Sequence, residues 1–247
     1  MDKRFIVQLL GKNFIGALKW PTIYLKLFLH RFDKSRQTGS KVLIFGLGRS
    51  GTTWVSNEIS KSYDLYDYGE VFQFPSRLIF SKFLNYLIVP KKSIVKLLTY
   101  QIIQNRISIT ELVNWINKNF DYVVIVQRNF LDQILSSLYS EQTKIYHNEM
   151  RDNLLSITLK KEDFKAREYW CHRNIQLRDD VISKITVKIR EIDYDQVAKD
   201  YFPEVLDEKK VLGKRKPKKI AKRISIRSVR DRIKNLDDVL GWVSDEE

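Results

Sequence analysis

Cysteine is almost absent from the sequence, which contains one, Cys171, among 247 residues. A single thiol excludes an internal disulfide framework and a cysteine-based metal cluster. It fits a reducing compartment, and we expect a cytoplasmic protein. The start of the chain also lacks the pattern of a signal peptide, because Lys12 interrupts the first apolar residues and no small-residue cleavage site follows.

Long apolar runs are absent as well. No stretch of about 18 or more uncharged apolar residues occurs, so we expect no membrane-spanning helix. Residues 5–32 are apolar with lysines at positions 12, 19 and 26, a spacing that places them on one face of a helix. Two interpretations remain open: a helical hairpin packed on the core, or a helix lying in a membrane interface as a peripheral contact.

Linker-like composition is missing too. The prolines and glycines are scattered, and no repeat or low-complexity block occurs. A chain of 247 residues that is 43% hydrophobic can bury the core of one domain. We therefore expect an N-terminal amphipathic helical segment over residues 1–40 and a single domain over residues 41–247.

Positive charge is abundant and unevenly distributed. The net charge is +14, and residues 209–234 carry thirteen Lys or Arg side chains against one acid, Asp231. Such a segment attracts nucleotide phosphates, acidic glycans, anionic lipid or nucleic acid. Apolar residues interrupt it, so part of it is expected to pack as a helix. We therefore do not expect nucleic acid as the primary partner, although a basic polyanion-binding protein remains an alternative.

Short apolar runs alternate with helical patterns along the chain. Buried strands are expected at 41–45, 121–126 and 185–189, and helices at 54–60, from about 131 and from 195. Residues 77–119 are expected to be largely helical, with a break at Pro90. The alternation predicts an α/β fold with a central parallel sheet flanked by helices on both faces.

A glycine-rich turn follows the first expected strand. It consists of Gly46, Leu47, Gly48, Arg49, Ser50, Gly51, Thr52, Thr53 and Trp54. A strand, a glycine turn and a helix form an anion cradle, because backbone N–H groups and the helix N-terminus point at the anion. The turn is not a Walker A loop, since Thr52 stands where that pattern requires lysine. This substitution counts against a nucleotide kinase or other P-loop phosphotransferase, which remains the main alternative.

The segment Arg49–Trp54 resembles the 5′-phosphosulfate loop of sulfotransferases that use 3′-phosphoadenosine 5′-phosphosulfate (PAPS). The resemblance implies a P-loop-like sulfotransferase fold. It also implies that Arg49 contacts the 5′-phosphate and the bridging oxygen, where charge develops as the S–O bond breaks. By the same resemblance, Ser50, Gly51, Thr52 and Thr53 supply donors, and Trp54 lies against the adenine.

A second motif supports the resemblance. Arg128 follows the strand at 121–126, and Ser136 lies eight residues further on, as in the family's 3′-phosphate motif, with Phe130 in place of the usual proline. Tyr194 lies in a segment that resembles the family's adenine-contacting segment, although a structural tyrosine fits equally well. Lys214 and Arg215 resemble the late basic loop that closes over the 3′-phosphate.

The general base, which removes a proton from the molecule that receives the sulfuryl group, is less evident. No histidine lies between the two cofactor motifs, whereas Glu70 occupies the position of the base in carbohydrate-type sulfotransferases. We expect Glu70 to be this base. The alternatives are that His172 or another acid is the base, and that Glu70 is only a solvent-exposed loop residue. No metal is expected. The acceptor is expected to be a hydroxyl or amine, with a preference for a saccharide such as a glycan or glycolipid.

Overall fold

The computed structural model describes residues 26, 29, 30, 32, 38–72, 89–144, 155–197, 204–207 and 229–244. Within the expected N-terminal helical segment, positions 26, 29 and 30 are helical, and most of the remainder lies outside the described residues. Among the helices that are described, none has the length and apolar character needed to cross a bilayer.

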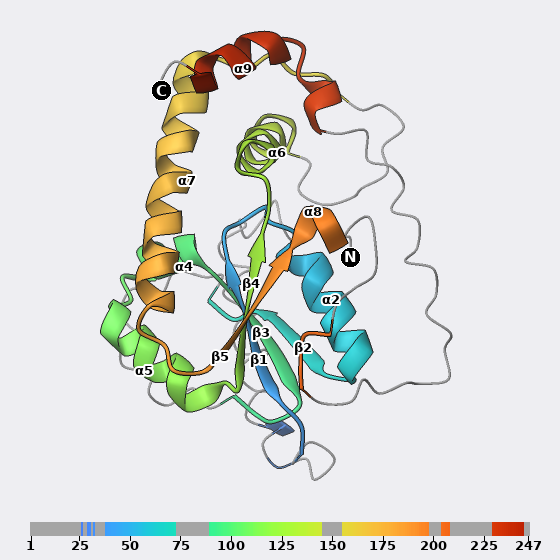
Figure 1. Cartoon of the computed structure of the whole chain (residues 1–247), viewed down its shortest axis with the longest axis vertical. Coiled ribbons are helices and arrows are strands. Elements are labelled where there is room, and N and C mark those ends of the chain that lie inside the picture. Colours follow the sequence, from blue (N-terminus) through green and yellow to red (C-terminus); the bar gives the residue numbers. More distant parts are fainter. Residues whose placement is uncertain are drawn as a thin grey trace, which may run out of the picture.

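A five-stranded, all-parallel sheet forms the centre of the molecule (Figure 1). Across the sheet the order is β2-β3-β1-β4-β5, with strands β1 (Lys41–Gly46), β2 (Tyr66–Glu70), β3 (Ser93–Leu98), β4 (Tyr122–Gln127) and β5 (Lys188–Asp193). The central strand β1 is buried on both faces, which explains its continuous apolar sequence. Because the strands are parallel, their carboxyl ends meet at one edge, where α/β proteins bind ligands.

Helices cover both faces of the sheet. Helix α2 (Thr52–Tyr63) packs Val55 and Ile59 against one face. Helix α5 (Ile109–Asn119) and the last turn of α7 (Lys161–Ile182) pack against the other. The short helices α4 (Thr99–Asn105) and α8 (Tyr194–Val197) directly follow β3 and β5. The expected α/β class and parallel sheet are therefore confirmed.

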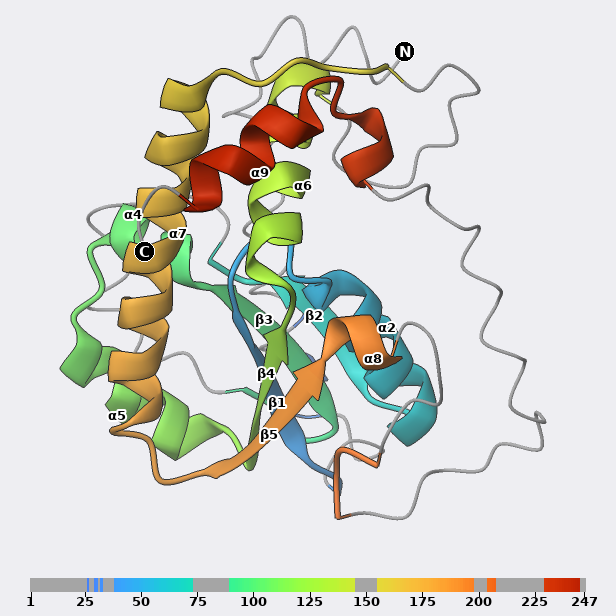
Figure 2. The ribbon, with the colours of Figure 1, turned by 45° about the horizontal axis from the view of Figure 1, so that its top comes forward.

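A further layer lies beyond the carboxyl ends of the strands (Figure 2). It consists of α6 (Phe130–Thr143), the first part of α7, the 3₁₀ helix η2 (Val229–Arg232) and α9 (Leu236–Ser244). Helix α6 rises directly from β4, and its start is fixed by the side chain of Asn129, which accepts the backbone N–H of Asp132 at 3.1 Å. This layer places α6 above the loop that follows β1.

The expectation that residues 77–119 are mainly helical is wrong for part of the described range. Residues 93–98 form strand β3, which pairs with β1 on one side and β2 on the other. This segment has the sequence Ser-Ile-Val-Lys-Leu-Leu, which is short and largely apolar. For such a run, the hydrophobic periodicity cannot tell a strand from a buried helix. The deciding factor is the presence of two parallel neighbours, which are distant in sequence.

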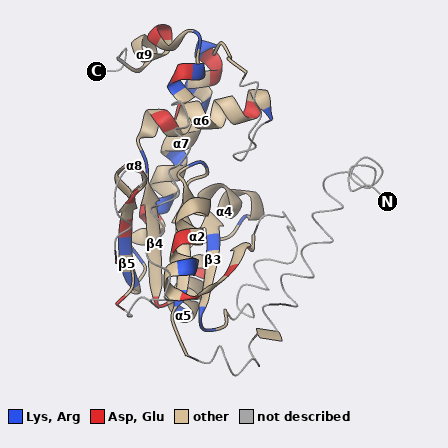
Figure 3. Cartoon of the chain, turned by 90° about the vertical axis from the view of Figure 1, so that its right-hand side faces the viewer, with Lys and Arg blue, Asp and Glu red and all other residues tan. Residues whose placement is uncertain are grey.

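Two further strands differ from the expectations. Strand β2 was not expected, because Tyr-Asp-Tyr-Gly-Glu is polar and contains a glycine. Strand β5 begins at Lys188, three residues after the expected start, and most of its side chains are charged, which suits an edge strand. Figure 3 shows the charged positions along β5.

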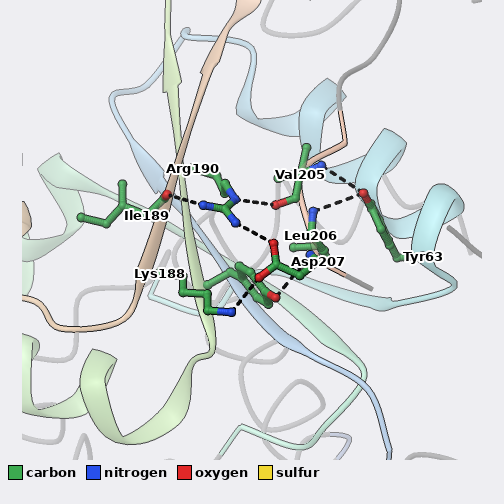
Figure 4. Close-up of polar contacts among 8 residues, drawn as sticks. Tyr63, Lys188, Ile189, Arg190, Val205, Leu206 and Asp207 are labelled. Atoms are coloured by element: carbon green, nitrogen blue, oxygen red, sulfur yellow. Dashed lines mark hydrogen bonds and ion pairs between the residues drawn. The ribbon is translucent and has the colours of Figure 1, made fainter. Parts of the chain in front are cut away.

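Segment 204–207 is attached to the β5 side of the sheet by polar contacts (Figure 4). The hydroxyl oxygen of Tyr63 accepts the backbone N–H groups of Val205 and Leu206 at 3.0 and 3.2 Å. The carboxylate of Asp207 accepts from Lys188 at 2.6 Å and from Arg190 at 2.7 Å. This segment is therefore tied both to α2 and to the edge strand.

Candidate functional site

The loop between β1 and α2 has the geometry of an anion cradle. Two of its residues have a left-handed backbone, Arg49 with φ 67° and Gly51 with φ 90°. Gly51 is the N-cap of α2, no side chain caps this end, and the first turn contains no acid. The start of α2 therefore has no acid to oppose an anion, which the positive end of the helix attracts.

Side chains of the next strand and helix hold this loop by its carbonyl groups. Arg128 donates from Nη1 to the carbonyl oxygen of Arg49 at 2.9 Å, and Gln133 donates from Nε2 to the carbonyl of Gly48 at 2.8 Å. Inside the loop, the hydroxyl of Ser50 donates to the carbonyl of Leu47 at 2.8 Å. Gln133 was not expected from the sequence. These bonds preorganise the loop, since its carbonyl groups are tied toward β4 and α6.

One N–H group of Arg128, at the buried Nε, has no hydrogen-bond partner among the described residues. Burial lowers the pKa of Arg128, while the carboxylates of Asp195 and Asp132 oppose this effect. The guanidinium also lies over the ring of Tyr194, with Cζ 5.3 Å from the ring centroid. A partly desolvated cation with an unsatisfied N–H group is suited to bind an anion.

The two expected cofactor motifs lie side by side in the structure. Arg49 donates from Nε to the hydroxyl of Ser136 at 3.3 Å, although 87 residues separate them in the sequence. Ser136 is buried on α6 with 4% of its surface exposed. The structure therefore brings Arg49, Arg128 and Ser136 together at the carboxyl ends of β1 and β4.

Two aromatic residues complete this half of the site. Tyr194 packs edge-on against Trp54, with ring centroids 5.9 Å apart, and only 4% of it is exposed. It also lies directly over Gly51, because a Cβ atom added there would come within 2.2 Å of the Tyr194 ring. The absence of a side chain at position 51 is what allows this packing.

Gly51→Ala should therefore destabilise the protein. The substitution combines a left-handed backbone with a clash against Tyr194, and we expect a loss of about 1–3 kcal/mol or more in the free energy of unfolding. The matched control is Gly48→Ala, where the added Cβ would meet Tyr100 at an ordinary 3.9 Å. Denaturant unfolding of both variants checks this, and equal stability would contradict the packing described here.

The other half of the site lies at the ends of β2 and β3. Lys96 on β3 is only 7% exposed, and its Nζ lies 3.4 Å from the hydroxyl oxygen of Thr53 on α2. The sequence analysis missed Lys96. The available signal was a charged residue within an otherwise apolar run, which indicates either an exposed position or a buried functional one. The structure shows that this ammonium group is directed toward the glycine loop.

Glu70 is the last residue of β2 and pairs in register with Lys96. Its Oε2 accepts from Nε2 of Gln101 at 3.0 Å, and the hydroxyl of Tyr100 lies 3.5 Å away. Burial, together with the nearby charge of Glu70, raises the pKa of Tyr100 to about 12. Tyr100 is therefore a neutral hydroxyl donor near neutral pH. Tyr100 and Gln101 were not expected from the sequence.

The structure does not place the remaining candidates from the sequence in this site. His172 is exposed on α7, and its ring packs at a tilt against Phe130 with centroids 4.5 Å apart. Lys214 and Arg215 lie outside the described residues. In the part of the chain that the structure describes, no group of three or more His, Cys, Asp or Glu side chains is arranged as a metal site.

No family model, curated protein or solved structure matches the chain. The functional argument therefore rests on the residues themselves. One side has a helix start with glycine at its N-cap, two arginines and a serine, and the other has a buried lysine that pairs in register with Glu70.

Proposed function

We propose that this protein is a PAPS-dependent sulfotransferase, which transfers a sulfuryl group to a hydroxyl or amine of an acceptor, with a saccharide as the favoured class. The observation that carries the proposal is the convergence of Arg49, Arg128 and Ser136. These residues belong to two motifs that each resemble a phosphate-binding element of that family. The parallel sheet with its glycine loop after β1 also supports a P-loop-like sulfotransferase fold.

The residues divide into a nucleotide half and a transfer half. The loop residues Ser50 to Thr53 would bind the 5′-phosphosulfate, and Arg128 with Ser136 would bind the 3′-phosphate. Tyr194 and Trp54 would lie near the adenine. On the transfer side, Lys96 and Arg49 would stabilise the negative charge that develops on the oxygens as the S–O bond breaks. Glu70 would accept the proton of the acceptor.

The proposal predicts a preference among nucleotides. The protein should bind 3′-phosphoadenosine 5′-phosphate without divalent metal, and adenosine 5′-phosphate at least about tenfold more weakly, because one charge-assisted hydrogen bond contributes about 1.5–3 kcal/mol. Arg128→Met should remove most of this preference, whereas Arg106→Met, at the exposed end of α4, should preserve it.

Calorimetric titration measures these affinities, and transfer of label from PAPS to a glycan acceptor tests the reaction itself. Equal affinity of the wild-type protein for the two nucleotides would refute the role of Arg128 and Ser136. Tighter binding of ATP with Mg²⁺ than of PAPS would favour the phosphotransferase alternative instead.

A further inference from the structure

The described residues hold the carboxylate of Glu70 through one of its oxygens. The amide of Gln101 and the hydroxyl of Tyr100 both lie at Oε2. Among the described residues, no hydrogen bond reaches Oε1. A carboxylate that is fixed through one oxygen presents the other in a defined direction, which is the arrangement that proton transfer from a bound hydroxyl to the carboxylate requires.

Gln101 is itself fixed in orientation. Its side chain is completely buried, and its Oε1 accepts the backbone N–H of Leu98 at 3.0 Å. Leu98 is the last residue of β3, so the acceptor end of the amide is bound to the sheet. The donor end must therefore face Glu70, because an amide has its oxygen and nitrogen on opposite sides.

A β-bulge sets the position of Glu70 from the other direction. The register between β2 and β3 shifts between Asp67 and Glu70, and Gly69 has φ 67°. The carboxylate of Asp67 accepts the backbone N–H of Gly69 at 2.7 Å and the hydroxyl of Ser56 at 2.5 Å. A bulge redirects the side chains that follow it, and here it places Glu70 opposite Lys96.

Tyr100 links this carboxylate to the glycine loop. A Cβ atom at Gly48 would lie 3.9 Å from the Tyr100 ring, so the ring lies against the loop, while its hydroxyl points to Glu70. The proton-accepting group and the anion-binding loop are thus connected by one side chain, whose raised pKa keeps its hydroxyl protonated.

We propose that Gln101 is a positioning residue for sulfuryl transfer: it holds Oε2 of Glu70, so that Oε1 takes the acceptor proton. This inference rests on the proposed function. In the step, the acceptor oxygen forms a bond to sulfur, and the bond between sulfur and the 5′-phosphate oxygen breaks. The proton of the acceptor moves to Oε1, and 3′-phosphoadenosine 5′-phosphate leaves with the electron pair.

The test compares two glutamines of one helix. Gln101→Met removes the donor to Glu70, whereas Gln104→Met, on the exposed side of α4, keeps it. We expect Gln101→Met to lower kcat about tenfold with an unchanged KM for PAPS, since a misplaced base affects the chemical step rather than nucleotide binding. Gln104→Met should behave as wild type. An unchanged kcat in Gln101→Met would overturn the proposal.

A second readout does not depend on activity. The carbon-13 signal of the Glu70 carboxylate, assigned by its loss in Glu70→Gln, should shift in Gln101→Met and stay in place in Gln104→Met. An unmoved signal in Gln101→Met would show that Gln101 does not hold the carboxylate. If the wild-type protein transfers no sulfuryl group, the role of Glu70 as proton acceptor is refuted together with the proposed function. The carboxylate signal still decides whether Gln101 holds Glu70.

Because Gln101 is buried, Gln101→Met could fail to fold, and a second variant then replaces it in the test. Gln101→Glu keeps an oxygen for the N–H of Leu98 and places a second carboxyl group against Glu70. We expect it to lower kcat by at least as much as Gln101→Met, since two adjacent carboxyl groups share a proton. Wild-type turnover in a folded Gln101→Glu variant would also overturn the proposal.

Discussion

Replacing Lys96 by methionine should lower kcat about 10²–10³-fold, the size of effect seen when one stabilising donor is removed from a transition state. Lys96 is only 7% exposed, and its ammonium group lies beside Thr53. In such a poorly solvated position, its charge interacts strongly with negative charge that develops nearby. Methionine keeps much of the length and packing of the lysine stem, so the fold should be preserved.

Steady-state kinetics with PAPS measure this effect, and Lys118→Met, at the exposed end of α5, is the matched control. The affinity for 3′-phosphoadenosine 5′-phosphate should fall much less than kcat, because the interaction strengthens in the transition state. If affinity and turnover instead fell by the same factor in Lys96→Met, Lys96 would be a residue for ground-state binding.

Glu70→Gln should lower turnover by about 10²–10⁴-fold, the range that a positioned general base contributes. Glutamine keeps the shape of the side chain and removes its ability to accept a proton. Nucleotide affinity should remain nearly unchanged, because Glu70 lies at the end of β2, on the side of the loop away from Arg128 and Ser136.

Single-turnover measurement of label transfer separates the chemical step from binding for this variant. Glu58→Gln is the control, since Glu58 pairs with its near neighbour Lys61 on the surface of α2. Turnover of Glu70→Gln close to that of the control would exclude Glu70 as the base. His172 would then be the next side chain to test.

The sequence predicts those parts of the fold that depend on local pattern. The strand at 41–46, the glycine turn and the start of α2 follow one another within a few residues, and each has a strong local signal. The spacing of Arg128 and Ser136 is also local, because Arg128 directly follows β4 and Ser136 lies in α6, the helix that comes next. The class of fold follows from the alternation of such units.

The transfer half of the site could not be predicted in the same way. Strand β3 is defined by pairing with β1 and β2, so its identity depends on contacts that are distant in sequence. Lys96 is buried only because this pairing places it under the glycine loop. Gln101 gains its role from two bonds that form once β3 and α4 are in place, and nothing in the surrounding sequence marks it.

The ties between β5 and segment 204–207 have a consequence for self-association. An edge strand offers unpaired backbone groups on which strands of other molecules can add, and fixed charges along the edge oppose this. Hydrogen bonds from Lys188 and Arg190 hold the pKa of Asp207 down to about 2. A carboxylate whose pKa is lowered in the folded protein stabilises it fully at pH values above the ordinary pKa of the carboxyl group. This stabilisation is lost only as the pH falls toward the lowered pKa. Segment 204–207 should therefore stay tied to the edge strand in all but strongly acidic solution, while Lys188 and Arg190 stay charged throughout and oppose strand addition.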